Sequence, residues 1–301
     1  MHTHQLFPRL ATSVIPTANW LFDHAIETLA GFNVWQRTLA FFVLWIFVWL
    51  PVIIPLARAL TWQPHQPLQP SQKIAFVASL YLVAWPILWV AAQLPAYSWH
   101  DYGLASGYIL GVGGAAGLGL ALLGLAVVFA TESWLGWLTW RPQNLPRLVP
   151  LALPILAIAL WVSCTEEVIF RGVLLSWFAA EYGGWLALLI TSAAFALAHL
   201  VWGWRQALPQ LPGLFFMAVV LVLARQVAAG NLGLACGLHA GWIWGLTALD
   251  TAALMQYSDR ASPWLTGLDG QPLAGLAGGL CLLLTAAALV LWSGGLALAW
   301  G

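Results

Sequence analysis

A few ionisable side chains in this sequence lie inside long apolar runs, where a charge is costly and therefore informative. They are Glu166 and Glu167 with Arg171 nearby, and the histidines His199 and His239. An ionisable residue at bilayer depth costs several kcal/mol, so it marks a functional site by default. A carboxylate and two imidazoles that converge at low dielectric can activate a water molecule. We therefore begin from the hypothesis that these residues form a hydrolytic site.

The spacing of the acidic residues predicts different roles for the two glutamates. Glu167 and Arg171 are four residues apart, so on a helix they share a face and can form an ion pair. Glu166 is turned by about 100° from its neighbour, which leaves it free to face a different cavity. A purely structural role, the neutralisation of arginines in the bundle, is the alternative for both, and it fits Glu167 better than Glu166.

Each histidine also has a structural alternative, because a single histidine in an apolar helix is usually a core residue. Phe195 lies four residues before His199, so its ring can pack against the imidazole and hold its rotamer. Beside His239, the glycines Gly237 and Gly241 leave room for a ligand or for water. Three such groups on separate helices are harder to explain as core residues together than one by one.

The composition predicts that membrane-spanning helices position these residues. Of the 301 residues, 62% are hydrophobic and 7% are charged, against about 45–50% and about 25% in soluble domains. This excludes an ordinary soluble protein and a disordered chain. Ten Lys and Arg residues balance ten acidic residues, which excludes a nucleic-acid partner. The three cysteines, Cys164, Cys236 and Cys281, each lie in an apolar run and are expected to be buried and unpaired.

The apolar runs predict an all-α fold, a polytopic transmembrane bundle of about eight spans, because about 20 residues cross a bilayer. We expect a polar, interfacial lead-in over residues 1–38 and one helical domain over 39–301, with its catalytic core at 148–249. The predicted spans are 39–60, 74–94, 107–130, 148–180, 184–202, 213–229, 232–249 and 273–300.

One feature of these spans conflicts with a shared site. Straight helices would place His199 and His239 near opposite ends of their spans, at different depths. Either a boundary differs from the one predicted, or the fourth and seventh spans are irregular.

The connections between the spans predict an orientation. Six Lys or Arg residues follow odd-numbered spans and three lie on the other side, so the first set is expected inside. The protein is thus expected to be a multi-pass protein of the plasma (inner) membrane. The first set is Arg58, Lys73, Arg141, Arg147, Arg205 and Arg260.

Glycines in the third span predict close helix packing. Gly107 and Gly111 form one small-xxx-small pair, and Gly113 and Gly117 form another. We expect them to pack inside the bundle, with a dimer face as the alternative.

Three motifs in order resemble those of the CPBP family of intramembrane proteases, which includes type II CAAX prenyl endopeptidases and bacteriocin-processing or Abi-family proteins. The first is the pair Glu166 and Glu167 with Arg171, and the second is Phe195 with His199. The third starts at His239. The resemblance covers about residues 148–249.

The third motif departs from part of the family. Ile243 stands four residues after His239, where some members have an asparagine that is thought to stabilise the oxyanion together with the histidine. Here His239 is expected to act alone or to borrow another donor, such as the indole of Trp242 or Trp244.

The resemblance implies a peptide hydrolase that uses a glutamate-activated water and no cofactor. In this scheme Glu166 is the general base, His199 holds and polarises the water, and His239 donates to the developing oxyanion. Glu167, Arg171 and Phe195 would support this geometry without reacting.

Three alternatives stay open at this point. Glu166, His199 and His239 could form a zinc site, although the His-Glu-x-x-His spacing of a zincin is absent. Zinc-bound histidines normally donate to a second carboxylate or carbonyl, and Glu167 is expected to be taken by Arg171, which favours the metal-free scheme. The other two are a proton-coupled transporter and a non-catalytic membrane scaffold or immunity protein with the same fold.

The expected partners are the lipid bilayer and a membrane-anchored or lipidated protein or peptide substrate, for which a C-terminal sorting tail is one candidate. The sequence does not identify the substrate or its cleavage site, and it does not predict an oligomeric state.

Overall fold

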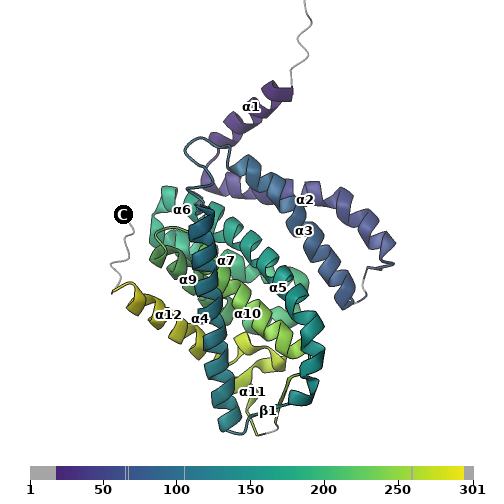
Figure 1. Ribbon diagram of the computed structural model, residues 1–301. Helices are drawn as coiled ribbons and strands as arrows, with labels where there is room; N and C mark the ends of the chain where they lie inside the picture. The colour runs from purple at the N-terminus through teal and green to yellow at the C-terminus, as the bar shows by residue number, and fades with distance from the viewer. Residues whose placement is uncertain (1–17, 65, 67, 105, 259, 295–301) are drawn as a thin grey trace, which may run out of the picture.

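The computed structural model describes residues 18–64, 66, 68–104, 106–258 and 260–294 (Figure 1). Residues 1–17 of the predicted lead-in and residues 295–300 of the last predicted span lie outside the described residues. The described part is helical except for turns and one short antiparallel strand pair, in which Leu138 pairs with Tyr257. This confirms the predicted all-α bundle.

The elements follow one another along the chain as follows: α1 (Ala18–Ala30), α2 (Val34–Ala59), α3 (Pro70–Ala91), α4 (Gly107–Trp134), β1 (Leu138–Trp140), η1 (Pro142–Asn144), α5 (Leu145–Glu167), η2 (Val168–Leu174), α6 (Leu175–Tyr182), α7 (Gly184–Ala198), η3 (His199–Trp202), α8 (Trp204–Ala207), η4 (Leu208–Gln210), α9 (Leu211–Val227), α10 (Gly233–Thr251), β2 (Met255–Tyr257), α11 (Pro263–Thr266), η5 (Leu268–Gly270), η6 (Pro272–Ala274) and α12 (Leu276–Trp292).

Six helical segments of the described chain are long and apolar enough to cross a membrane, and they coincide with the first six predicted spans. The protein is therefore an integral membrane protein. The seventh and eighth predicted spans correspond to α10, with 19 residues, and α12, with 17 residues. Every residue of α10 from Gly233 to Trp242 is buried, so this helix lies at the centre of the bundle. Figure 1 shows α2 and α3 as a pair beside the bundle that contains α4, α5, α7, α9 and α10.

Glycines bring α4 and α10 into close contact. A Cβ atom added to Gly117 would overlap the backbone of Leu234, and one added to Gly237 would overlap the backbone of Gly114. Only residues without a Cβ allow two helix backbones to approach this closely. The structure confirms internal packing for Gly117, whereas a Cβ on Gly107 would meet no neighbouring atom within 4 Å. This contact holds α10, and with it His239, against the rest of the bundle.

The fourth predicted span is irregular. Helix α5 ends at Glu167, and η2 continues it as a π-helical turn that contains Arg171 before α6 begins. A π-helical turn bonds residues five apart, so it redirects the side chains that follow and leaves carbonyl groups available. The guanidinium of Arg225 donates to the carbonyl of Arg171 and, at 2.8 Å, to that of Asp101. Arg225 thus ties the π turn to the connection between α3 and α4.

Both histidine-bearing spans depart from straight helices that run from surface to surface. Helix α7 ends at Ala198, and His199 opens a 3₁₀ turn. At the other side, the turn before α10 is buried under the α3–α4 connection, where the Leu232 amide donates to the Gly103 carbonyl at 3.0 Å. Leu232 is fully buried, so α10 begins inside the protein and not at its surface.

Candidate active site

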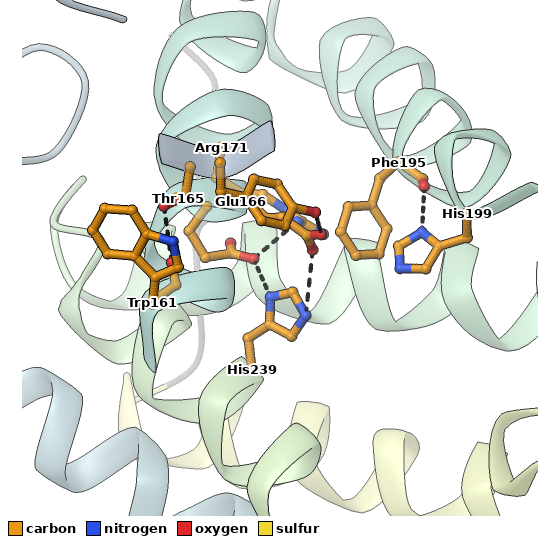
Figure 2. A network of polar contacts seen from close by, with 9 residues as sticks. Trp161, Thr165, Glu166, Arg171, Phe195, His199 and His239 are labelled. Atoms are coloured by element: carbon orange, nitrogen blue, oxygen red, sulfur yellow. Dashed lines mark hydrogen bonds and ion pairs between the residues drawn. The ribbon is translucent and has the colours of Figure 1, made fainter. Parts of the chain in front are cut away.

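Glu167 and His239 form the buried centre of the candidate site (Figure 2). Oε1 of Glu167 accepts a hydrogen bond from Nη1 of Arg171 at 2.9 Å, which confirms the predicted i, i+4 pair. The same oxygen lies 2.8 Å from Nδ1 of His239. One carboxylate therefore holds both the arginine of the π turn and the histidine of α10.

This contact fixes the ring of His239. A carboxylate only accepts hydrogen bonds, so Nδ1 of His239 carries a hydrogen and donates it to Glu167. Nε2 then faces Glu166, whose Oε2 lies 3.7 Å away. That separation is too long for a hydrogen bond, so Nε2 keeps its bonding capacity for another group.

The sequence reasoning about Glu167 was wrong in one respect. It treated the carboxylate as fully used by Arg171, and it used this as an argument against zinc. The structure shows that the same Glu167 oxygen also bonds His239. The Glu167–His239 contact is of the kind that orients zinc-bound histidines, so this particular argument against a metal does not hold.

The donor set nevertheless does not fit a metal. Within the described ranges, no group of three or more His, Cys, Asp or Glu side chains is arranged to hold an ion. Glu166 and His239 face each other, but His199 lies on the far side of the Phe195 ring (Figure 2).

Tyr81 is a functional candidate that the sequence reasoning missed. Its hydroxyl donates to Oε1 of Glu166, and both side chains are buried. Tyr81 lies in α3, so a third part of the chain reaches the site. A tyrosine in an apolar span is a weak signal, but a buried tyrosine hydroxyl usually has a polar partner. Glu166 is thus held by one oxygen and presents the other to His239.

His199 occupies the open end of the site. Its Nδ1 lies 2.9 Å from the carbonyl oxygen of Phe195. Because a carbonyl only accepts, Nδ1 carries the hydrogen, and in the neutral ring Nε2 is the acceptor. The imidazole also packs on the Phe195 ring with 4.7 Å between centroids, as the spacing predicted.

The Phe195 ring connects the two histidines. Its centroid lies 5.8 Å from that of His239, nearly perpendicular, and 4.3 Å from the guanidinium carbon of Arg171. Figure 2 shows Phe195 between His199 and the cluster of Glu166, Arg171 and His239. The ring therefore fixes His199 and also covers the buried arginine with a favourable cation–π contact.

The two indoles considered as substitutes for the missing asparagine have different environments. Nε1 of Trp244 donates to the carbonyl of Ala152 at 2.8 Å, so this group is committed elsewhere. Nε1 of Trp242 is buried and has no hydrogen-bond partner among the described residues. Trp242 follows His239 by three residues, so the two lie on adjacent positions of the α10 surface. Of the two, only the Trp242 indole retains an unused donor.

The arrangement brings together one carboxylate and two imidazoles. Glu166 has an oxygen without a hydrogen bond, His239 has an Nε2 without a hydrogen bond, and His199 has an Nε2 that can accept a hydrogen bond from water. Burial of Glu166 and His239 strengthens electrostatic interactions with anything that binds there. The three predicted residues are thus placed around one region, but His199 meets the other two through Phe195 and not by a direct contact.

Comparison with known proteins gives a family for this region. Residues 147–245 match the family model of type II CAAX prenyl endopeptidase Rce1-like proteins. The match contains all three motifs, from Glu166 to Ile243. This family generally consists of proteases, so the match does not favour a transporter or a non-catalytic scaffold.

One curated relative is similar over part of its length. It is an uncharacterized 24.3 kDa protein of Escherichia coli, 31% identical over 134 residues. The alignment covers 44% of this chain and 58% of the relative, so the chain spans somewhat more than half of that protein. No solved structure matches.

Proposed function

We propose that this chain, which belongs to the CPBP family of membrane proteases through its Rce1-like domain, is an intramembrane endopeptidase with Glu166 as its general base. The observation that carries the proposal is the pair of Glu166 Oε2 and His239 Nε2, which face each other at 3.7 Å in a buried site. A peptide carbonyl and a water molecule need these two functions, a base and a hydrogen-bond donor, at one place.

In the proposed reaction, Glu166 takes a proton from a water molecule that enters from the side of His199, whose Nε2 accepts a hydrogen bond from the entering water. The resulting hydroxide attacks the peptide carbonyl. With Nε2 protonated, His239 donates to the oxyanion, while Glu167 stabilises the imidazolium through Nδ1. Glu166 then returns the proton to the leaving amine as the C–N bond breaks. Glu166 alone carries the proton from the water molecule to the leaving amine, so protons and charge balance over the reaction.

We assign supporting roles to the neighbours of these groups. Tyr81 orients the Glu166 carboxylate, and Arg171 holds the Glu167 carboxylate in place. The Trp242 indole supplies a second oxyanion donor in the position where Ile243 replaces asparagine. One such donor is worth about 3–4 kcal/mol in other hydrolases.

The proposed substrate is a membrane-anchored or lipidated protein or peptide, with C-terminal sorting tails among the candidates. The proposed location is the plasma (inner) membrane, because the connections carry the charge bias of an inner-membrane protein. The proposed chemistry requires no cofactor and involves no nucleic acid.

The test compares Glu166→Gln with Glu132→Gln. Both remove a buried carboxylate from an apolar helix, but Glu132 bonds Tyr257, outside the site. Membranes containing each variant or the wild type are profiled by mass spectrometry for new protein termini. Termini that appear with the wild type and Glu132→Gln but not with Glu166→Gln, at equal abundance of the three proteins, support the proposal. Termini unchanged by Glu166→Gln would refute it.

The same preparation tests the metal-free scheme. Purified protein in detergent should keep cleaving the identified peptide after treatment with a chelator and dialysis. Activity that disappears with the chelator and returns with added Zn²⁺ would establish the zinc alternative.

A further inference from the structure

A polar cavity of about 200 Å³ adjoins the open end of the candidate site. His199 forms part of its wall, and Leu214 is buried at its edge. The remaining polar wall consists of Lys73 and three glutamines, Gln206, Gln210 and Gln271. We call this cavity the amide pocket. It is distinct from a larger hollow of about 660 Å³, which is lined mainly by apolar side chains of α4 and α12.

The lining residues come from three connections on one face of the bundle. Lys73 lies in the first turn of α3, Gln206 and Gln210 lie between α7 and α9, and Gln271 lies between η5 and η6. These connections follow the first, fifth and seventh predicted spans. The predicted topology places these connections on one side of the membrane, where a polar occupant has access from water.

The charge of the pocket indicates which kind of polar group it binds. Lys73 is the single charged residue among those that line it, and no acidic side chain lines it. Gln210 is held in place, since its Nε2 donates to the Gln206 carbonyl at 2.9 Å. One exposed ammonium group in a wall that otherwise offers amide groups suits a carboxylate, because charge-assisted hydrogen bonds to carboxylates are the strongest of these contacts.

The size of the pocket limits what enters. Its volume of about 200 Å³ corresponds to about six or seven water molecules, at about 30 Å³ each, or to one or two residues of an extended peptide. Because His199 is shared between the pocket and the site, these residues would lie next to the bond that is cleaved. A lipid chain would instead fit the large apolar hollow.

We infer that the amide pocket binds a carboxylate of the substrate peptide within one or two residues of the cleaved bond, with Lys73 as the group that recognises it. The inference rests on the proposed function and adds one feature of the substrate, a carboxylate close to the cleaved bond. The carboxylate is either the free C-terminus or the side chain of Asp or Glu, and the experiment below separates these two sources.

The test measures binding to purified Glu166→Gln protein, which is used so that peptides are not consumed. Three N-dodecanoyl tripeptides serve as probes: trialanine with a free C-terminus, trialanine with a C-terminal amide, and Ala-Glu-Ala with a C-terminal amide. We expect one carboxylate probe to bind about five- to tenfold more tightly than the neutral amide probe. Whichever carboxylate probe shows this preference identifies the source.

The tighter binding of the carboxylate probe should disappear when Lys73→Gln is added to the Glu166→Gln protein. It should persist when Arg58→Gln is added instead, because Arg58 lies at the end of α2 and does not line the pocket. A preference that survives Lys73→Gln, or no preference in the parent protein, would overturn the inference. Displacement of the peptides by dodecyl phosphate with equal potency would also overturn it, since the pocket would then be a lipid-headgroup site.

These outcomes are independent of catalysis. The proposed function fails if Glu166→Gln leaves cleavage intact, whatever the probes do. The pocket inference fails if binding ignores Lys73, even when cleavage depends on Glu166. With the wild-type enzyme, Lys73→Gln should raise KM for the matching peptide substrate by the same factor and leave kcat within about twofold, because Lys73 binds the substrate and does not react.

Discussion

The two histidines of the candidate site lie in opposite surroundings. His239 is 2% exposed, bonded to Glu167 and enclosed by α5, the π turn and α10. His199 is half-buried, begins a 3₁₀ turn at the end of α7 and borders a polar cavity. Both rings keep one nitrogen occupied by an acceptor and the other free. They differ in what can reach that free nitrogen.

This difference suggests a division of labour within the site. The closed side, around His239, holds fixed charges in a dry environment, where they act most strongly on a developing oxyanion. The open side, around His199, admits water and the polar part of a substrate. Variants on the closed side should therefore affect folding and the rate of chemistry, and variants on the open side should affect access and binding.

The largest expected effect is at Glu167, on the closed side. Glu167→Ala leaves the buried Arg171 without its anion, and breaking such a pair costs about 3–5 kcal/mol. Because Glu167 also holds His239, the molecules that do fold should have lower kcat. Abundance is measured by immunoblotting of membranes, and activity is expressed per folded molecule.

Two variants serve as references for this effect. Glu166→Gln should keep normal abundance and lose activity, whereas Glu132→Ala removes a buried acid without an arginine partner and should reduce stability by a smaller amount, about 1–3 kcal/mol. If Glu166→Ala and Glu167→Ala lowered abundance and activity equally, the two glutamates would not differ in role.

The next largest effect is expected at Trp242. Trp242→Phe removes an indole donor that has no partner among the described residues, so stability should be unchanged while kcat falls about a hundredfold. Trp244→Phe should do the opposite. It leaves the Ala152 carbonyl without its donor, which should cost about 1–3 kcal/mol in stability and leave kcat unchanged. Equal kcat values for Trp242→Phe and the wild type would show that His239 acts without this donor.

A smaller effect is expected at Tyr81. Tyr81→Phe removes the hydrogen bond to Glu166, so the carboxylate loses its fixed orientation and kcat should fall about tenfold. Tyr102→Phe is the matched control. Its hydroxyl is also buried and donates to Ala91 at 2.9 Å, but outside the site. The control should lower thermal stability in detergent without a change in kcat, and a similar loss of kcat in both variants would contradict a specific role for Tyr81.

The closed side was the more predictable of the two from sequence. The pairing of Glu167 with Arg171 follows from helix geometry alone, and the two motif histidines are recognised by their type and position. The hydrogen bond between Glu167 and His239 was missed because Glu167 was expected to have Arg171 as its single partner. A carboxylate oxygen can accept from two donors, so the bond to Arg171 leaves it able to accept another. Tyr81 was missed because 85 residues separate it from Glu166, and no local spacing relates them.

The backbone irregularities that shape the site were harder to predict. A π-helical turn has no simple sequence pattern, so irregularity of the span at 148–180 was only one of two alternatives that the sequence left open. The buried turn before α10 depends on contacts with the α3–α4 connection, which hydropathy does not register. Hydropathy did predict the first six spans, because lipid-facing helices must be apolar whatever their neighbours are.

Two cysteine substitutions are expected to have the smallest effect on catalysis. They also test directly whether the site is open around His199 and closed around His239. The background has Cys164, Cys236 and Cys281 replaced by serine or alanine. Gln206→Cys places a thiol in the wall of the amide pocket, and Ser163→Cys places one beside the buried centre, four residues before Glu167. Each change is small, so the unlabelled variants should keep kcat within about twofold of the background.

A membrane-impermeant maleimide should then separate the two positions. The thiol at 206 should react within minutes in membranes that expose the correct face, and the attached group should block access to His199 and abolish cleavage. Ser163 is completely buried, so a thiol at this position should react only after the protein is unfolded. The reagent cannot reach it in the folded protein, and burial disfavours the reactive thiolate form. Substrate peptide should protect position 206 and leave position 163 unaffected. Equal labelling rates at the two positions would mean that the site is not closed around His239. Unhindered cleavage after labelling at 206 would mean that water and substrate arrive by another route.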